Sequence, residues 1–325
     1  MRALQRIAIV SLLVACDTGA VVPASAQNYP TKPVRIITAG AGTFHDIVTR
    51  QLGQRLSERW GQPVIVDNRP GAGLTIGTAV TAKSHPDGHT LLMSDRTALA
   101  AAPSLHKSLP YDPVKDFAPI TLAALSPLML VAHPSVPASN LREFIAYAKQ
   151  QPGGLNIAAA GPGTATHMTG EQLKQITGVN LVSVQYKGGG ASALAIVSGE
   201  TKAGFGSVPN VLPHVAGGRI KAYAITSRKR FSGAPDIPTA TEAGLPGFES
   251  EQWIGMLAPA RTSSELISRL NRDMVEFLQT PEMQAVLRAQ GAEPAPGTPA
   301  QFAAFIKSET IKLKKVIESA GIRAE

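Results

Sequence analysis

Short β-branched runs that alternate with amphipathic stretches constrain the fold of this chain more than any other feature. The first strand signals lie at residues 34–38, 63–67 and 90–94, with helical periodicity between them at 46–60 and 74–83. A second alternating unit follows, with strand signals at residues 128–133, 156–159, 181–185, 202–205 and 221–226. Strands and helices that alternate through short connections predict an α/β fold, in which helices cover both faces of a mostly parallel sheet.

The last seventy residues or so change character, because three helical patterns follow one another there. They begin near Ser264, Pro281 and Pro299. The third has Thr298 in the N-cap position, proline at the first helical position and Gln301 three residues after the cap, which predicts a capping box. We interpret these helices as a structural cover and assign them no chemistry.

The N-terminus has the pattern of an export signal. Arg2 and Arg6 precede a short apolar region at residues 7–15, and Ala24-Ser25-Ala26 forms an A-x-A cleavage site. We therefore expect residues 1–26 to be a signal peptide and the mature protein to lie in the periplasm. The apolar region is about half as long as a membrane-spanning helix requires, although an uncleaved N-terminal anchor is the alternative.

Cys16 is the one cysteine of the chain. Because residues 13–16 read LVAC, lipoprotein processing before Cys16 is an alternative to soluble release. If cleavage follows Ala26, the mature chain has no cysteine, which excludes disulfides, a thiolate nucleophile and cysteine zinc sites.

The charge of the chain is basic, with a formal net charge of +8. Such a chain suits an anionic partner. Lys and Arg are scattered rather than arranged in a stripe, and aromatic residues make up 5% of the chain, too few for base-stacking platforms. We therefore expect a small anion rather than nucleic acid.

Two glycine-containing loops precede helices and carry the chemistry that we expect. The loop at residues 39–46 follows the first strand, and the loop at 160–167 follows the strand at 156–159. Free backbone N–H groups and the helix dipole at such positions attract anions. One such loop in each α/β unit predicts a clamp for a dicarboxylate. The alternative is that Asp46 only caps its helix and that His167 only packs or is exposed.

Other kinds of chemistry are poorly supported by the sequence. The segment 71–77 (GAGLTIG) resembles a dinucleotide-binding loop, but its last spacing is one residue too long and it follows the second strand. The chain has no G-x-S-x-G elbow, and its seven histidines are dispersed along the sequence. We therefore expect no cofactor, no metal ion and no catalytic residues.

Several longer segments together resemble one known family. They are residues 66–73 (VDNRPGAG), 86–92 (PDGHTLL), 185–189 (QYKGG), 212–214 (LPH), 253–259 (WIGMLAP), 290–294 (QGAEP) and 320–322 (AGI). On these segments the chain resembles the Bug family, the substrate-binding receptors of tripartite tricarboxylate transporters, from Tyr29 to the C-terminus.

The resemblance implies a type II periplasmic-binding-protein fold, in which two α/β lobes close over a central ligand cleft at a hinge. Lobe 1 would comprise residues 27–130 and 251–325, and lobe 2 residues 131–250. It also implies a monomeric receptor that captures a small organic acid and delivers it to membrane transporter subunits, without enzymatic activity. A sensor subunit for a membrane kinase and an enzyme that reuses the fold are the alternatives.

The binding loops depart from the family pattern, which usually reads P-G-G-x-x-D in the first loop. Here Thr43 replaces the second glycine, and Phe44 and His45 are bulky where small residues are usual. Ala159 and Ala160 replace serines in the second loop, and Asp95-Arg96 places charges where small polar residues are common. Phe44 suggests an aromatic or less polar acid, whereas Arg96 is either a carboxylate ligand or part of a structural salt bridge.

These considerations define the predicted ligand-binding residues. Asp46 would orient the first loop. The predicted residues are Gly42, Thr43, Phe44, His45 and Asp46 from the first loop, Gly163, Thr164 and Thr166 from the second, and Ser94, Arg96, Thr97, Lys187 and Ser207 as further residues of the cleft.

Overall fold

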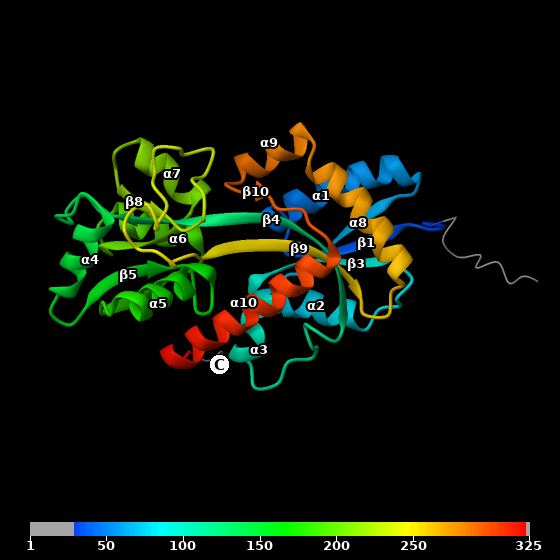
Figure 1. The fold of residues 1–325 in the computed structure, drawn as a ribbon, viewed down its shortest axis with the longest axis horizontal. Coiled ribbons are helices and arrows are strands. Elements are labelled where there is room, and N and C mark those ends of the chain that lie inside the picture. Colours follow the sequence, from blue (N-terminus) through cyan, green and yellow to red (C-terminus); the bar gives the residue numbers. More distant parts are fainter. Residues whose placement is uncertain (1–28, 323–325) are drawn as a thin grey trace, which may run out of the picture.

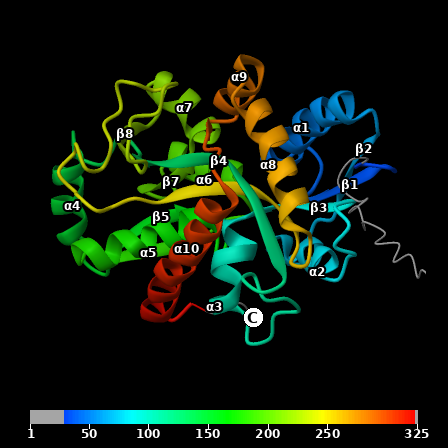
Figure 2. The ribbon, with the colours of Figure 1, turned by 45° about the vertical axis from the view of Figure 1, so that its right-hand side comes forward.

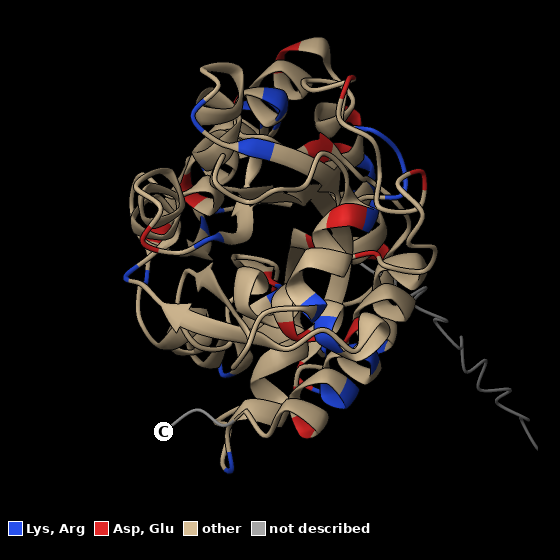
Figure 3. Cartoon of the chain, turned by 90° about the vertical axis from the view of Figure 1, so that its left-hand side faces the viewer, with Lys and Arg blue, Asp and Glu red and all other residues tan. Residues whose placement is uncertain are grey.

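The computed structural model describes residues 29–322. The predicted signal peptide, its cleavage site and Cys16 lie outside this range. Within the described range, no helix is both long enough and apolar enough to cross a membrane. Lys and Arg are distributed among acidic residues over the chain rather than gathered in one stripe (Figure 3).

The described strands form one continuous sheet with the order β2-β1-β3-β9-β4-β7-β5-β6, and β8 and β10 also pair with β4. Pairing is parallel within β2-β1-β3 and within β7-β5-β6, and antiparallel wherever β4 or β9 takes part. The strands are β1 (Val34–Thr38), β2 (Val64–Asn68), β3 (Thr90–Asp95), β4 (Phe117–Ala132), β5 (Leu155–Ala159), β6 (Leu181–Gln185), β7 (Ala203–Ser207), β8 (Lys221–Ile225), β9 (Glu251–Pro259) and β10 (Glu293–Pro294).

Helices lie on both faces of this sheet in each half of the molecule (Figure 1). They are α1 (Phe44–Trp60), α2 (Thr75–Ala82), α3 (Ala102–Leu105), α4 (Leu141–Lys149), α5 (Ala165–Thr177), α6 (Gly189–Val197), α7 (Val208–Ala216), α8 (Ser264–Leu278), α9 (Pro281–Ala289) and α10 (Pro299–Ala320), with short turns η1 (Ala72–Leu74) and η2 (Thr97–Ala101). The starts of α8, α9 and α10 are as predicted, and the capping box between Thr298 and Gln301 is confirmed.

The long strand β4 joins the two halves of the sheet. Residues 117–127 pair with β9, whereas residues 128–132 pair with β7 and β8. The sequence signal at 128–133 captured only the second part of this strand. Pro119 and Pro127 interrupt the strand pattern in the first part, where the register with β9 also shifts.

The hydrophobic core is divided in the same way. One cluster of buried side chains comes from residues 29–124 and 254–292. A second comes from residues 37–122 and 253–317, with Met168 of α5. The other two clusters are built from residues 128–248. Each half of the sheet therefore has its own core, and β4 and β9 cross between the halves (Figure 1).

Helix α10 packs against this crossing and against α3 and α5 (Figure 2). Its Phe302 is 1% exposed and meets Trp253 of β9 edge to face, with 5.9 Å between ring centroids. Gly255 of β9 lies beneath the same ring, because a Cβ atom built there would be 2.2 Å from Phe302 Cζ. Only a residue without a side chain permits this close approach of helix and strand.

We expect Gly255→Ala to destabilise the protein by about 1–3 kcal/mol, since the buried Phe302 ring has no free space into which to move. Urea denaturation measures the change. The matched control is Gly190→Ala in α6, where an added Cβ atom would have no neighbour within 4 Å. The control is expected to be neutral or slightly stabilising, and equal stability of Gly255→Ala and wild type would contradict this account of the packing.

Candidate functional site

A cavity of about 500 Å³ lies where the two halves of the sheet meet, which is within the range typical of small-molecule sites. Its walls come from the loop before α1, the end of β3, the starts of α5, α6 and α7, and the first part of β9. Eight predicted residues line it, namely Thr43, Phe44, His45, Arg96, Thr97, Thr164, Thr166 and Ser207.

The other five predicted residues do not line this cavity. Ser94 is buried and lies 3.4 Å from the Thr78 hydroxyl. Lys187 is exposed to solvent. Gly42, Asp46 and Gly163 belong to the two loops and shape them from behind, through the hydrogen bonds described below.

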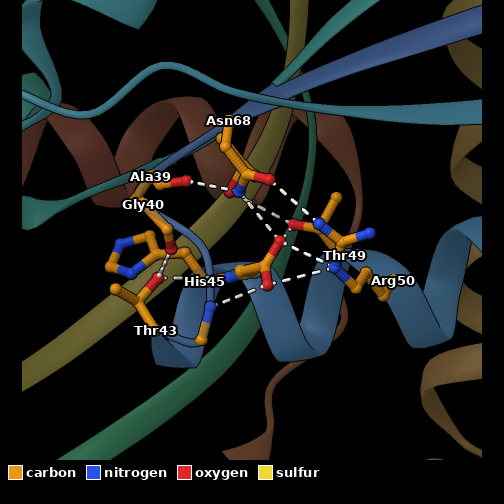
Figure 4. A network of polar contacts seen from close by, with 10 residues as sticks. Ala39, Gly40, Thr43, His45, Thr49, Arg50 and Asn68 are labelled. Atoms are coloured by element: carbon orange, nitrogen blue, oxygen red, sulfur yellow. Dashed lines mark hydrogen bonds and ion pairs between the residues drawn. The ribbon is translucent and has the colours of Figure 1, made fainter.

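Asp46 holds the first loop in place. Its carboxylate accepts hydrogen bonds from the Gly42 amide (2.9 Å), the Asn68 side chain (2.8 Å) and Arg50 (3.1 Å) (Figure 4). Burial alone would raise the pKa of Asp46, but these hydrogen bonds hold it below its usual value. The N-cap of α1 is Thr43, whose hydroxyl accepts from the Asp46 amide. Asp46 therefore orients the loop and does not itself cap the helix.

The second loop is held by its own hydroxyl and imidazole groups. The Ala160 amide donates to Thr166 Oγ1 at 2.9 Å, and the Gly163 amide donates to His167 Nδ1 at 3.1 Å. His167 is 8% exposed, and burial lowers the pKa of its imidazole. The sequence left open whether His167 packs at the helix start or is exposed, and the structure shows that it packs there.

Three helix N-termini open onto the cavity without a capping side chain. The N-caps of α5, α6 and α7 are Thr164, Gly188 and Ser207, and all three line the cavity. None makes a side-chain capping hydrogen bond, whereas the N-caps of α4, α8, α9 and α10 all do. The amides in these first turns and the aligned helix dipoles therefore favour an anion in the cavity.

Arg96 supplies a buried positive charge on the side of the cavity opposite the starts of α5, α6 and α7. It is 4% exposed, and none of its guanidinium nitrogens has a hydrogen-bond partner among the described residues. Arg96 Nε lies 3.3 Å from the Glu309 carboxylate of α10, which balances its charge. Burial lowers the pKa of Arg96, and Glu309 acts in the opposite direction. A guanidinium with unused donors is suited to bidentate binding of a carboxylate.

Glu309 lies beside the cavity wall and was not predicted, because the C-terminal helices were assigned no chemistry. Asp95, whose charge the sequence marked as unusual without placing it among the predicted ligand-binding residues, lies at the end of β3 beside Arg96 and lines the cavity. Its Oδ2 atom is 3.1 Å from His45 Nε2, and its Oδ1 atom accepts from the Ala98 amide at 2.9 Å. Asn210 and Gln252 also line the cavity, although no local sequence signal marks them.

A second group of charges lies behind Arg96, at the start of β9. Arg228 binds Glu249 at 2.7 Å, and Lys312 donates to the Glu249 backbone carbonyl. Glu251 lines the same hollow and is partly buried. The pKa of Glu251 is raised to about 7, chiefly by burial and then by the negative charges of Glu249 and Glu309, whereas Lys312 and Arg228 act in the opposite direction.

Comparison with known proteins identifies the family of this chain. Residues 48–322 match the model of the tripartite tricarboxylate transporter family receptor. The chain belongs to this receptor family. Its resemblance to Bug proteins is likewise confirmed, since it is 35% identical to Protein BugT of Bordetella pertussis over 325 residues, covering 99% of both chains.

Solved structures of similar receptors show the same fold. The R. palustris protein Rpa4515, solved with adipate, aligns with a TM-score of 0.78 at 31% identity and covers 91% of this chain and 99% of its own. MatC from Rhodopseudomonas palustris, solved with bound malate, aligns with a TM-score of 0.73 at 30% identity, covering 89% and 100%. The predicted type II periplasmic-binding-protein fold is thereby confirmed.

The raised pKa of Glu251 predicts a specific pH dependence of stability. An ordinary glutamate has a pKa of 4.5, and that of Glu251 in the folded protein is about 7. Between these values the folded protein binds more protons than the unfolded chain, so the stability contributed by this residue is lost as the pH rises. The loss is at most about 3.5 kcal/mol, because one pKa unit corresponds to about 1.4 kcal/mol.

We expect Glu251→Gln to melt at a higher temperature than wild type at pH 8 and at nearly the same temperature at pH 4.5. Thermal unfolding monitored by circular dichroism at both pH values measures this. Glu318→Gln, which removes an exposed carboxylate on α10, is the control and should show no such difference. Identical melting curves of Glu251→Gln and wild type at pH 8 would refute the prediction.

Proposed function

We propose that this receptor captures a small carboxylate in the cavity between the two halves of the sheet. One observation carries the proposal. A buried arginine with unused hydrogen-bond donors lines the same cavity as three uncapped helix N-termini. Each of these features favours an anion, and the planar guanidinium matches the two oxygens of a carboxylate. The adipate and malate bound to the similar receptors support this ligand class.

The ligand would be held from both sides of the cavity. Thr43, Phe44, His45, Arg96 and Thr97 would contact it from one side. Thr164, Thr166 and Ser207 would contact it from the other, with Gly42, Asp46 and Gly163 shaping the loops. Ser94 and Lys187 have no direct role in this proposal. Ser94 is buried against the Thr78 hydroxyl, and Lys187 is exposed to solvent.

Ligand binding would close two lobes, namely residues 27–130 with 251–325 and residues 131–250. The crossing strands β4 and β9 are the connections at which such a movement would occur. A ligand that bridges the lobes stabilises the closed form, which the membrane subunits of a transporter can distinguish from the open form. We propose that the protein acts as a monomer and has no catalytic activity.

The site of action would be the periplasm, after removal of residues 1–26. Lipidation at Cys16 is the alternative route, which would tether the same receptor to the membrane surface. Intact mass analysis of the exported protein distinguishes the two, because only signal peptidase cleavage after Ala26 gives an unlipidated chain that begins at Gln27.

The proposed function is tested by a thermal-shift screen of the purified protein against small organic acids, amino acids and aromatic acids. A ligand at one hundred times its dissociation constant adds about 2.7 kcal/mol to stability. We expect stabilisation by at least one class of carboxylate and none by the corresponding amides. Stabilisation by no carboxylate, in protein shown by mass spectrometry to be free of co-purified ligand, would overturn the proposal.

We expect Arg96→Lys to weaken binding of such a carboxylate about tenfold or more. Lysine keeps a positive charge beside Glu309 but lacks the planar pair of donors. Isothermal titration calorimetry measures the change. Arg228→Lys is the matched control, because Arg228 pairs with Glu249 outside the cavity. Unchanged affinity in folded Arg96→Lys protein would remove Arg96 from the binding site.

A further inference from the structure

The charges on the cavity wall differ from what a ligand with two equivalent anionic ends would require. The ionisable side chains that line the cavity within residues 29–322 are His45, Asp95 and Arg96. Arg96 carries the positive charge, and Asp95 places a carboxylate next to it in the chain. The lining on the other side, at the starts of α5, α6 and α7, is neutral.

Arg96 and Asp95 are each held in place by a side chain of a different helix. The Arg96 guanidinium lies against Glu309 of α10, 3.3 Å from its carboxylate. Asp95 faces α1, where its Oδ2 atom lies 3.1 Å from His45 Nε2. Two partners on different helices thus hold two opposite charges at the end of one strand, and both residues line the same cavity.

Asp95 retains the capacity to accept further hydrogen bonds. A carboxylate has about four acceptor positions and, when ionised, no donor. The structure uses one position for the Ala98 amide and one for His45. The side chain is 17% exposed, and the residue borders the cavity. The remaining positions can take a hydroxyl or ammonium donor from a ligand, whereas a carboxylate placed there would be repelled.

We propose that Asp95 is a specificity-determining residue, which selects carboxylates that carry a hydrogen-bond donor on the neighbouring carbon and disfavours a second carboxylate at that place. The ligand class is therefore a 2-hydroxy or 2-amino acid, with its carboxylate on Arg96 and its donor on Asp95. This inference rests on the proposed function, because it assumes that a carboxylate occupies the cavity. It adds that the negative charge of Asp95 selects the group on the carbon next to the ligand carboxylate.

The test uses ligands that differ in one group on the same carbon chain. The six-carbon set is hexanoate, 2-hydroxyhexanoate, 2-aminohexanoate and adipate, and the four-carbon set is butanoate, 2-hydroxybutanoate, 2-aminobutanoate and succinate. Isothermal titration calorimetry with the purified protein gives each dissociation constant. We expect a 2-substituted acid to bind at least tenfold more tightly than the unsubstituted acid and the dicarboxylate of the same length.

Asp95→Asn tests the residue itself. Asparagine keeps one oxygen that can accept from the Ala98 amide, and its NH2 group can donate to the His45 imidazole nitrogen, so the local fold is kept while the charge is removed. We expect the preference for the 2-substituted acid to fall at least tenfold and the affinity for the dicarboxylate to rise. Asp112→Asn is the matched control, since Asp112 likewise accepts backbone amides, from Val114 and Lys115, but lies outside the cavity.

The two proposals fail in different ways. If carboxylates bind but Asp95→Asn leaves their ranking unchanged, the specificity inference is overturned and carboxylate capture stands. If the wild-type protein binds adipate or succinate more tightly than the 2-substituted acids, the specificity inference is likewise overturned and carboxylate capture stands. If none of the eight acids binds, both the inference and the proposed function are overturned for acids of this size. The hydroxy and amino members of each set show which donor Asp95 selects.

Discussion

The antiparallel pairing of β4 with β9 positions nearly every other feature of this receptor. Because β4 pairs with β9 along residues 117–127 and continues as the neighbour of β7, one strand belongs to both halves of the sheet. β9 in turn lies beside β3, so that the register places Asp95 opposite Ile254. The end of β3 and the starts of three helices from the other half therefore border one cavity. Gly255 permits α10 to pack directly on this crossing, which brings Glu309 close to Arg96.

The electrostatics of the cavity follow from this placement. Helix N-termini attract anions when their first amides are not satisfied by capping side chains, and those of α5, α6 and α7 open onto the cavity uncapped. Arg96 adds a charge that is costly to bury unless it is paired. Glu309 provides this pair, and Lys312, 3.7 Å from Glu309, extends the charges towards Glu249 and Glu251. The charges beside the cavity and those at the start of β9 thus form one connected group.

Much of the fold was predictable because its signals are local. The run at residues 34–38 and that at 181–185 are strands with the predicted bounds, and the capping box at Thr298 lies at a helix start, since both depend on neighbouring residues. The first half of β4 was missed because its prolines obscure a strand that is stabilised by distant partners. In the site, the two loops were recognised by their glycines and hydroxyls. Which loop residues face the cavity and which support it could not be read from spacing, because that depends on hydrogen bonds such as those of Asp46.

The sequence by itself determined the α/β class, the receptor family, the two loops and the unusual charges at Asp95 and Arg96, since each is written in contiguous residues. Only the tertiary structure decided what those charges do. Glu309 is more than two hundred residues from Arg96 in the chain, yet the packing of α10 makes it the counter-charge. Likewise, His45 meets Asp95 across fifty residues. The energy of a charge depends on its surroundings in three dimensions, on burial and on nearby opposite charges, and no local pattern of residues specifies these.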